Sequence, residues 1–131
     1  MCKKQISVLV KEEGEHQWLQ KYISSLSDVQ NICHGLVESI SLPYNIDLWV
    51  NEEGTITSEY QINLLLMWDE DHRYHQLIFG PVLLTGVDSE GKMTSLNELQ
   101  RKWVAKHLKI GQLKSGQFIS VIDLTDRGAI A

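Results

Sequence analysis

The residues from Asp69 to His75 form the densest group of side chains that could bind a metal ion. Three acidic residues and two histidines occur within these seven positions. His72 and His75 would share one face of a helix, but they would point to opposite faces of a strand. Because the segment is predicted to be a loop that enters a strand, we expect neither a metal site nor a cofactor here.

Cys33 is the second residue that could do chemistry, because a thiolate is a good nucleophile. Cysteine is also among the residue types most often buried, so we prefer the interpretation that Cys33 is a small apolar residue of a helix. The sequence has no Gly-x-Ser-x-Gly elbow, no Cys-x-x-Cys pair and no phosphate-binding glycine loop. We therefore predict that the protein is not an enzyme. A small enzyme that uses Cys33, His72 or His75 is kept as an alternative.

Basic side chains are concentrated in one part of an otherwise acidic chain. The net charge is −5, but residues 92–114 contain six basic residues and one acid. Four of these basic residues are predicted on the polar face of one helix: Arg101, Lys102, Lys106 and Lys109. This face is either a docking surface for phosphate or an acidic partner, or a solvated helix face with cations near its C-terminal end.

The four tryptophans are many for 131 residues. Trp103 is predicted on the apolar face of its helix, together with Leu99, and therefore in the core. Trp49 alternates with Leu48 and Val50 along a predicted strand, so its side chain points to the opposite face. This makes Trp49 the better candidate for a contact with a partner.

Alternating apolar residues predict most of the strands, which are residues 6–10, 17–23, 36–42, 46–51, 74–87 and 118–124. A short helix is the alternative at 17–23, and 55–67 is ambiguous. The strand 74–87 is interrupted at Gly80-Pro81, because proline cannot donate a hydrogen bond to a ladder.

Two short helices are predicted, at residues 28–34 and 96–108. Ser27 with Gln30 and Ser95 with Glu98 would form their capping boxes. Gly35 would end the first helix in the left-handed conformation.

This order of elements predicts an α+β fold, with a mostly antiparallel sheet and two short helices packed on one face. We expect residues 1–131 to form a single domain, in which 109–131 could be a C-terminal extension or an interface tail. No apolar run approaches the roughly 20 residues of a membrane helix, and no apolar stretch follows Lys3-Lys4. We therefore expect a cytoplasmic protein with no membrane association.

Several short motifs occur in an order that resembles a known family. They are Asp28–Gly35, Val37–Ile40, Val50–Gly54, Gln61–Asn63, Ile78–Gly86 and Thr94–Leu96. Together they are similar to domain-of-unknown-function family 3846, over about residues 5 to 107. The resemblance implies a small single-domain accessory protein from a phage or mobile element, and it brings no catalytic residues.

The small size, the resemblance and the missing catalytic pattern together predict a non-catalytic accessory protein of a phage or mobile element. It would bind and sequester or block a host component, which could be a defence protein or a signalling nucleotide. Its partner would be a host protein or an anionic small ligand, and it could form a homo-oligomer. The predicted binding residues are Trp49, Arg101, Lys102, Lys106 and Lys109. A nucleic-acid accessory protein that uses the basic helix 95–109 is the alternative.

Overall fold

The protein is described by a computed structural model, which covers residues 5–15, 17–53, 61–67 and 75–124. The larger sheet contains β1 (Ile6–Lys11), β2 (Leu19–Ile23), β3 (Val37–Leu42), β4 (Ile46–Asn51), β7 (Val82–Val87) and β8 (Met93–Thr94). The smaller sheet contains β5 (Ile62–Met67), β6 (His75–Phe79), β9 (Leu108–Gln112) and β10 (Phe118–Asp123). The helices are α1 (Leu26–Cys33) and α2 (Glu98–His107).

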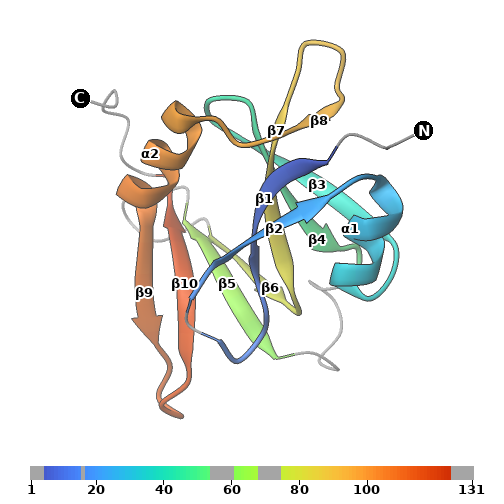
Figure 1. Ribbon diagram of the computed structural model, residues 1–131. Helices are drawn as coiled ribbons and strands as arrows, with labels where there is room; N and C mark the ends of the chain where they lie inside the picture. The colour runs from blue at the N-terminus through green and yellow to red at the C-terminus, as the bar shows by residue number, and fades with distance from the viewer. Residues whose placement is uncertain (1–4, 16, 54–60, 68–74, 125–131) are drawn as a thin grey trace.

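The strands are nearly all antiparallel, as the sequence predicts. The larger sheet has the order β2-β1-β7-β4-β3, with β8 paired to the end of β7, and the smaller sheet has the order β6-β5-β10-β9 (Figure 1). Among the strands of the described residues, only β5 and β10 run parallel to each other. Residues 19–23 form a strand that pairs with β1, which settles the choice between strand and helix there. The α+β fold class is confirmed.

The predicted interruption at Gly80-Pro81 is the point where the chain passes from one sheet to the other. It separates β6 from β7, and Gly80 has a φ of 86°. A positive φ is easy for glycine, because it has no Cβ to collide with the backbone. The long apolar stretch therefore becomes two strands in two sheets rather than one bulged strand.

Two apolar clusters cover the two faces of the larger sheet. The inter-sheet core combines inward residues of both sheets with Trp103 and Val104 of α2. The α1-side cluster consists of Val8, Val10, Ile23, Val29, Cys33 and Leu83. Neighbouring residues of one strand, such as Leu83 and Leu84, belong to different clusters because strand side chains alternate between faces.

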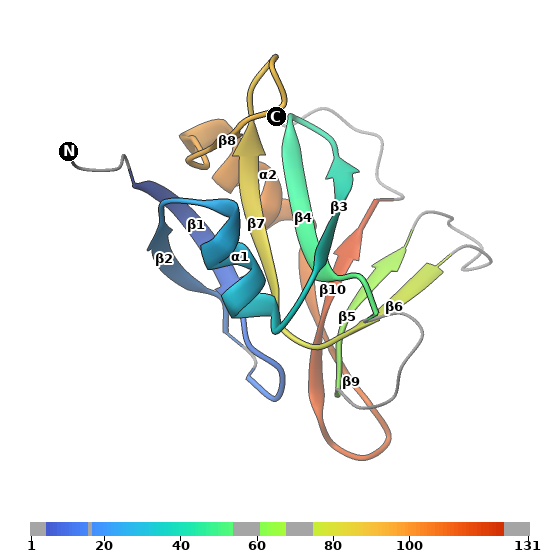
Figure 2. The same cartoon turned by 90° about the vertical axis from the view of Figure 1, so that its right-hand side faces the viewer.

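The two helices consequently lie on opposite faces of the larger sheet. Figure 2 shows α1 in front of this sheet and α2 behind it, in agreement with the two clusters. The expectation that both helices pack on one face was wrong. A sequence pattern shows which side of a helix is apolar, but it does not show which face of a sheet that side will cover.

Both helices begin at other caps than those predicted. Ser25 caps α1 and forms a capping box with Asp28, not Ser27 with Gln30. Asn97 caps α2 and forms a capping box with Gln100, because the Ser95 hydroxyl instead accepts the backbone N–H of Ser7 at 2.9 Å.

Two details of the helix ends and faces also differ from the prediction. His34, with φ of 64°, is the left-handed residue that ends α1, and Gly35 follows it. Leu99 is 50% exposed, whereas Gln100 is buried and its amide donates to the carbonyl oxygens of Tyr44 and Asn45 at 2.9 Å. α2 is therefore oriented so that Gln100, and not Leu99, points into the protein. The spacing of apolar residues alone does not predict this orientation.

Lys11 and Asn63 join the two sheets at a buried corner. The Lys11 ammonium donates to the Asn63 side-chain oxygen, and the Asn63 amide donates to the carbonyls of Lys11 at 3.0 Å and Gly80 at 2.9 Å. Both side chains are fully buried. Burial lowers the pKa of Lys11, and the nearby Glu15 carboxylate offsets part of this shift. Asn63 thus ties β1, β5 and the β6–β7 corner together.

Candidate functional site

A pocket of about 450 Å³ opens on the α1 side of the larger sheet. Four apolar side chains make most of its wall: Ile6, Leu26, Trp49 and Met93. Ser24, Gly91 and Lys92 complete the lining. The volume is within the usual range for a ligand pocket, about 300–1,000 Å³. We call it the Trp49 pocket, because Trp49 is the one residue predicted from the sequence that lines it.

Trp49 is fixed in place rather than freely exposed. Its indole Nε1 donates to the Thr85 hydroxyl at 2.9 Å, and its ring packs against the α1-side cluster. The ring is half-buried, so only part of it faces the pocket. A held aromatic ring loses little conformational entropy on binding, which favours it as a contact surface for an apolar group.

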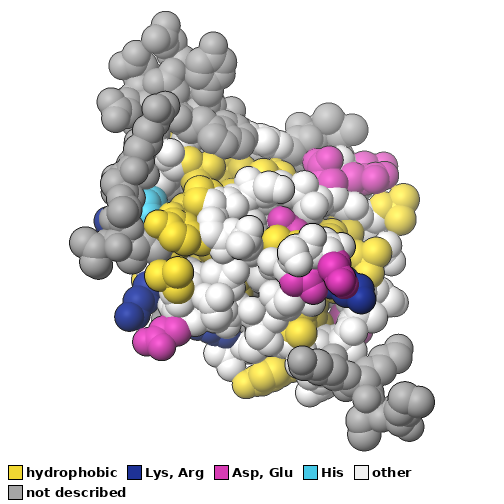
Figure 3. All heavy atoms as spheres, turned by 90° about the horizontal axis from the view of Figure 1, so that it is seen from above, with side chains coloured by type: hydrophobic (Ala, Val, Ile, Leu, Met, Phe, Trp, Pro, Cys, Tyr) yellow, Lys and Arg dark blue, Asp and Glu magenta, His cyan; other side chains and the backbone are white. Residues whose placement is uncertain are grey.

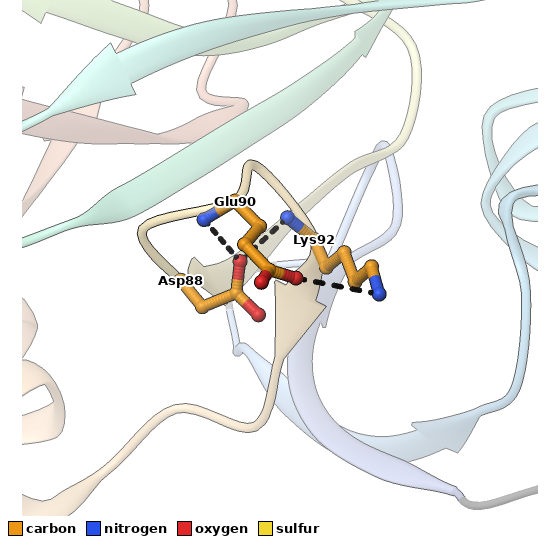
Figure 4. A network of polar contacts seen from close by, with 3 residues as sticks. All are labelled: Asp88, Glu90 and Lys92. Atoms are coloured by element: carbon orange, nitrogen blue, oxygen red, sulfur yellow. Dashed lines mark hydrogen bonds and ion pairs between the residues drawn. The ribbon is translucent and has the colours of Figure 1, made fainter.

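The rim of the pocket beside β8 is held by the short loop that follows β7 (Figure 4). The Asp88 carboxylate accepts the backbone N–H groups of Glu90 and Lys92, each at 2.9 Å. The Lys92 ammonium lies 3.4 Å from the Glu90 carboxylate. This turn orients the rim, and Glu90 balances the charge of Lys92.

Leu26 forms part of the opposite rim, in the first turn of α1. It is 46% exposed. The Asp28 carboxylate accepts the backbone N–H groups of Ser24 at 2.7 Å and Ser25 at 3.2 Å, which fixes the chain just before the helix. Both rims are therefore held by an aspartate that binds backbone N–H groups.

The predicted basic residues lie away from this pocket. Arg101, Lys102 and Lys106 are on α2, on the other face of the larger sheet. Lys109 belongs to β9, because α2 ends at His107. The structure therefore does not bring Trp49 and the basic residues into one site.

These basic side chains are also engaged within the molecule. Arg101 Nη2 donates to the Ser7 hydroxyl at 2.6 Å, and the Lys102 ammonium lies 3.6 Å from the Glu98 carboxylate. Lys109 is bonded to Asp123 at 2.9 Å, and Lys106 also has an interaction partner. In the view of Figure 3, acidic and basic side chains of the described residues are scattered among hydrophobic ones.

Cys33 is fully buried, as its residue type predicts. Its sulfur lies 3.9 Å from the Trp49 carbonyl oxygen. Burial, with a smaller contribution from Glu12, raises the pKa of the thiol to about 12. The thiolate is therefore scarcely populated near neutral pH, and a nucleophilic role has no support here. His72 lies outside the described residues, and His75 begins β6.

Two of the motif segments noted in the sequence meet at a smaller pocket of about 230 Å³. It is lined by His34, Gly35, Leu36, Asn51, Glu52 and Glu53. The Asn51 amide donates to the Cys33 carbonyl at 2.9 Å, and its side-chain oxygen accepts the Glu53 backbone N–H at 2.8 Å. Asn51 therefore joins the end of α1 to the turn after β4. Among the described residues, no group of three or more potential ligands is arranged to hold a metal ion.

No pattern in the sequence indicates the other residues of the Trp49 pocket. They come from the starts of β1 and α1 and from the loop and strand after β7, and the fold brings them together. The one usable signal was Trp49 itself, a large side chain on the opposite strand face from the buried Leu48 and Val50.

The fold and the pocket define a two-sheet α+β protein with a largely apolar pocket on one face of the larger sheet. The chain matches the family described as Domain of unknown function (DUF3846) over residues 6–109, and it belongs to that family. The comparison with curated proteins gave no match, and neither did the comparison with solved structures. No helix among the described residues is long and apolar enough to cross a membrane.

Proposed function

We propose that the protein is a non-catalytic accessory protein of a phage or mobile element, which binds and blocks a host protein. An apolar side chain of that protein inserts into the Trp49 pocket. The observation that carries the proposal is the pocket itself, in which a fixed tryptophan ring lies among aliphatic side chains at an open surface.

The charge around the pocket favours a protein over a nucleotide. Among the described residues that line the pocket, Lys92 is the only cation, and the Glu90 carboxylate lies 3.4 Å from its ammonium group. A polyphosphate needs several unbalanced cations or backbone N–H groups directed at it. An apolar side chain needs only the release of water from the pocket wall, which contributes about 25 cal/mol for each Å² buried.

The nucleic-acid alternative has less support. Nucleic-acid binding requires basic side chains that are available to contact phosphate groups, and its strength increases with the number of these contacts. Lys102 and Lys109 already lie next to carboxylates, and Arg101 is bonded to Ser7. Acidic residues also outnumber basic ones by 17 to 12 in the whole chain.

A matched pair of substitutions tests the proposal. Leu26→Lys places a charge at the pocket rim, and Leu99→Lys makes the same change at a second half-exposed leucine in the first turn of a helix. Tagged wild-type and variant proteins are used to capture partners from host lysate, with quantification by mass spectrometry. We expect a host protein that the wild type and Leu99→Lys retain and that Leu26→Lys retains at least about tenfold less, because an unpaired charge must be desolvated.

The same experiment has outcomes that would reject the proposal. Equal capture of every protein by all three baits would show that the pocket does not hold a protein partner. A nucleotide released on denaturation of the wild type and of Leu99→Lys, but not of Leu26→Lys, would make the pocket a small-ligand site instead.

A further inference from the structure

β9 is an edge strand of the smaller sheet, and its apolar residues are unusually exposed. Ile110, in the middle of β9, is 66% exposed, and Phe118 of the adjoining β10 is 45% exposed. β10 pairs with one edge of β9, and no described strand pairs with the other edge (Figure 1). An open edge of this kind presents backbone N–H and C=O groups that can accept another strand.

Proteins usually protect such edges with charge, proline, a bulge or strong twist. β9 has no proline, and its five residue pairs with β10 follow one another without a register shift. Its one charged residue is Lys109, and the Asp123 carboxylate at 2.9 Å balances that charge. The usual protection is therefore weak along β9.

The two edges of the larger sheet are less suited to self-pairing. β2 has Lys21 at its centre, so two copies paired about that residue would bring two ammonium groups together. β3 carries the exposed polar residues Glu38, Ser39 and Ser41. β6, the other edge of the smaller sheet, also has an aliphatic side chain at its centre, but Leu77 is 39% exposed and Ile110 is 66% exposed. Among the edge strands of the described residues, β9 therefore has the most exposed aliphatic side chain at its centre.

We propose that two copies of this protein form a dimer by antiparallel pairing of their β9 strands about a two-fold axis at Ile110. In this register Ile110 faces Ile110 of the second copy, Leu108 faces Gln112, and Lys109 faces Gly111. No two like charges are opposed, and the two isoleucines cover each other on one side of the extended sheet. Phe118 lies across from Gln112 on that same side and widens the apolar contact.

The dimer is independent of the Trp49 pocket, since it uses the smaller sheet. It is tested by sedimentation-velocity ultracentrifugation of the full chain over a range of concentrations. A short strand interface is small, so we expect a dimer at roughly 100 µM that dissociates on dilution to about 1 µM. A wild-type protein that stays monomeric at the higher concentration overturns the proposal.

A charge exchange tests the register. Ile110→Lys and Ile110→Glu each place two like charges at the axis, so each variant alone is expected to be monomeric. An equimolar mixture is expected to form a dimer again, because lysine then faces glutamate. Leu36→Lys, at a leucine that is 63% exposed beside another edge strand, is the matched control and is expected to remain dimeric.

Unfolding curves in urea verify that these variants fold, and the exposed position predicts midpoints close to that of the wild type. A dimer that persists in Ile110→Lys overturns the proposal. A mixture that stays monomeric, when the wild type dimerises, overturns the two-fold register at Ile110.

Discussion

The two faces of the larger sheet are buried in different ways. One face is closed by the smaller sheet and α2, and its central side chains Leu48 and Leu84 have no exposed surface. The other face is covered by α1, an eight-residue helix, and Trp49 there is left half-buried beneath a pocket. A helix of two turns cannot cover the face of a five-stranded path, so part of the apolar surface stays accessible to a partner.

Under the proposed function, stability and binding depend on opposite faces of the larger sheet. Substitutions in the inter-sheet core should destabilise the fold strongly, whereas substitutions at the pocket rim should change binding and have little effect on stability. Each of the following predictions tests one side of that contrast.

The largest effect is expected from Leu84→Ala in the inter-sheet core. The side chain is fully buried between the sheets, so its removal leaves a cavity and costs about 3–4 kcal/mol of the free energy of unfolding. Leu26→Ala at the pocket rim is the comparison, and we expect it to cost less than about 1 kcal/mol because Leu26 is half-exposed. Urea denaturation measures both values. Equal losses would contradict the contrast between the two faces.

A somewhat smaller loss is expected from Asn63→Ala at the corner of the two sheets. The change removes three hydrogen bonds and leaves the Lys11 ammonium and the carbonyls of Lys11 and Gly80 without this partner. Each of these three buried polar groups costs about 1 kcal/mol or more when it is left without a partner, so we expect a total of about 3 kcal/mol. Denaturation in urea again gives the value. Wild-type stability in this variant would show that Asn63 does not join the sheets.

The buried Lys11 makes stability depend on pH. Its folded pKa lies below its ordinary value of 10.5, so between these two values the unfolded chain binds more protons than the folded one. The free energy of unfolding of the wild type should therefore rise with pH in this window, relative to that of Lys11→Met. Paired denaturation curves at several pH values up to about 10.5 measure the difference. A difference that stays constant over the window would contradict the burial of a charged Lys11.

A smaller loss of stability than in the inter-sheet core is expected from Trp49→Phe in the pocket. A smaller aromatic ring still faces the pocket, but the hydrogen bond from the indole to Thr85, whose side chain is fully buried, is lost. We expect a loss of about 1 kcal/mol, measured by thermal unfolding. Unfolding of the variant at room temperature would show that Trp49 contributes as much to stability as the residues of the inter-sheet core.

Much of the fold could be predicted, because the signals for it are local. Strands 6–10, 46–51 and 118–124 follow from alternation of apolar residues, and Gly80-Pro81 predicts the break at which the sheets separate. The residues that cap the helices are harder to predict. Ser25 and Ser27 both begin a plausible capping box, and the sequence alone does not show which of the two the packed structure will use.

The site was harder to predict than the fold, because its parts are distant in sequence. Ile6, Leu26 and Met93 look like ordinary apolar residues of three different elements, and only the fold brings them next to Trp49. Lys11 likewise resembles a polar strand end, yet it is fully buried against Asn63. Contacts between elements that are distant in the sequence decide both cases, and no local sequence pattern indicates them.

The most direct test of the central claim is a nuclear magnetic resonance titration of the ¹⁵N-labelled protein with two probes, indole and adenosine monophosphate. We predict that indole shifts the Trp49 indole N–H signal and the backbone amides of Ile6 and Met93, with a dissociation constant of roughly millimolar order. The shifts should be lost in Leu26→Lys and kept in Leu99→Lys, and adenosine monophosphate should leave these signals unchanged. Signals that respond to the nucleotide and not to indole would contradict a pocket built for an apolar side chain.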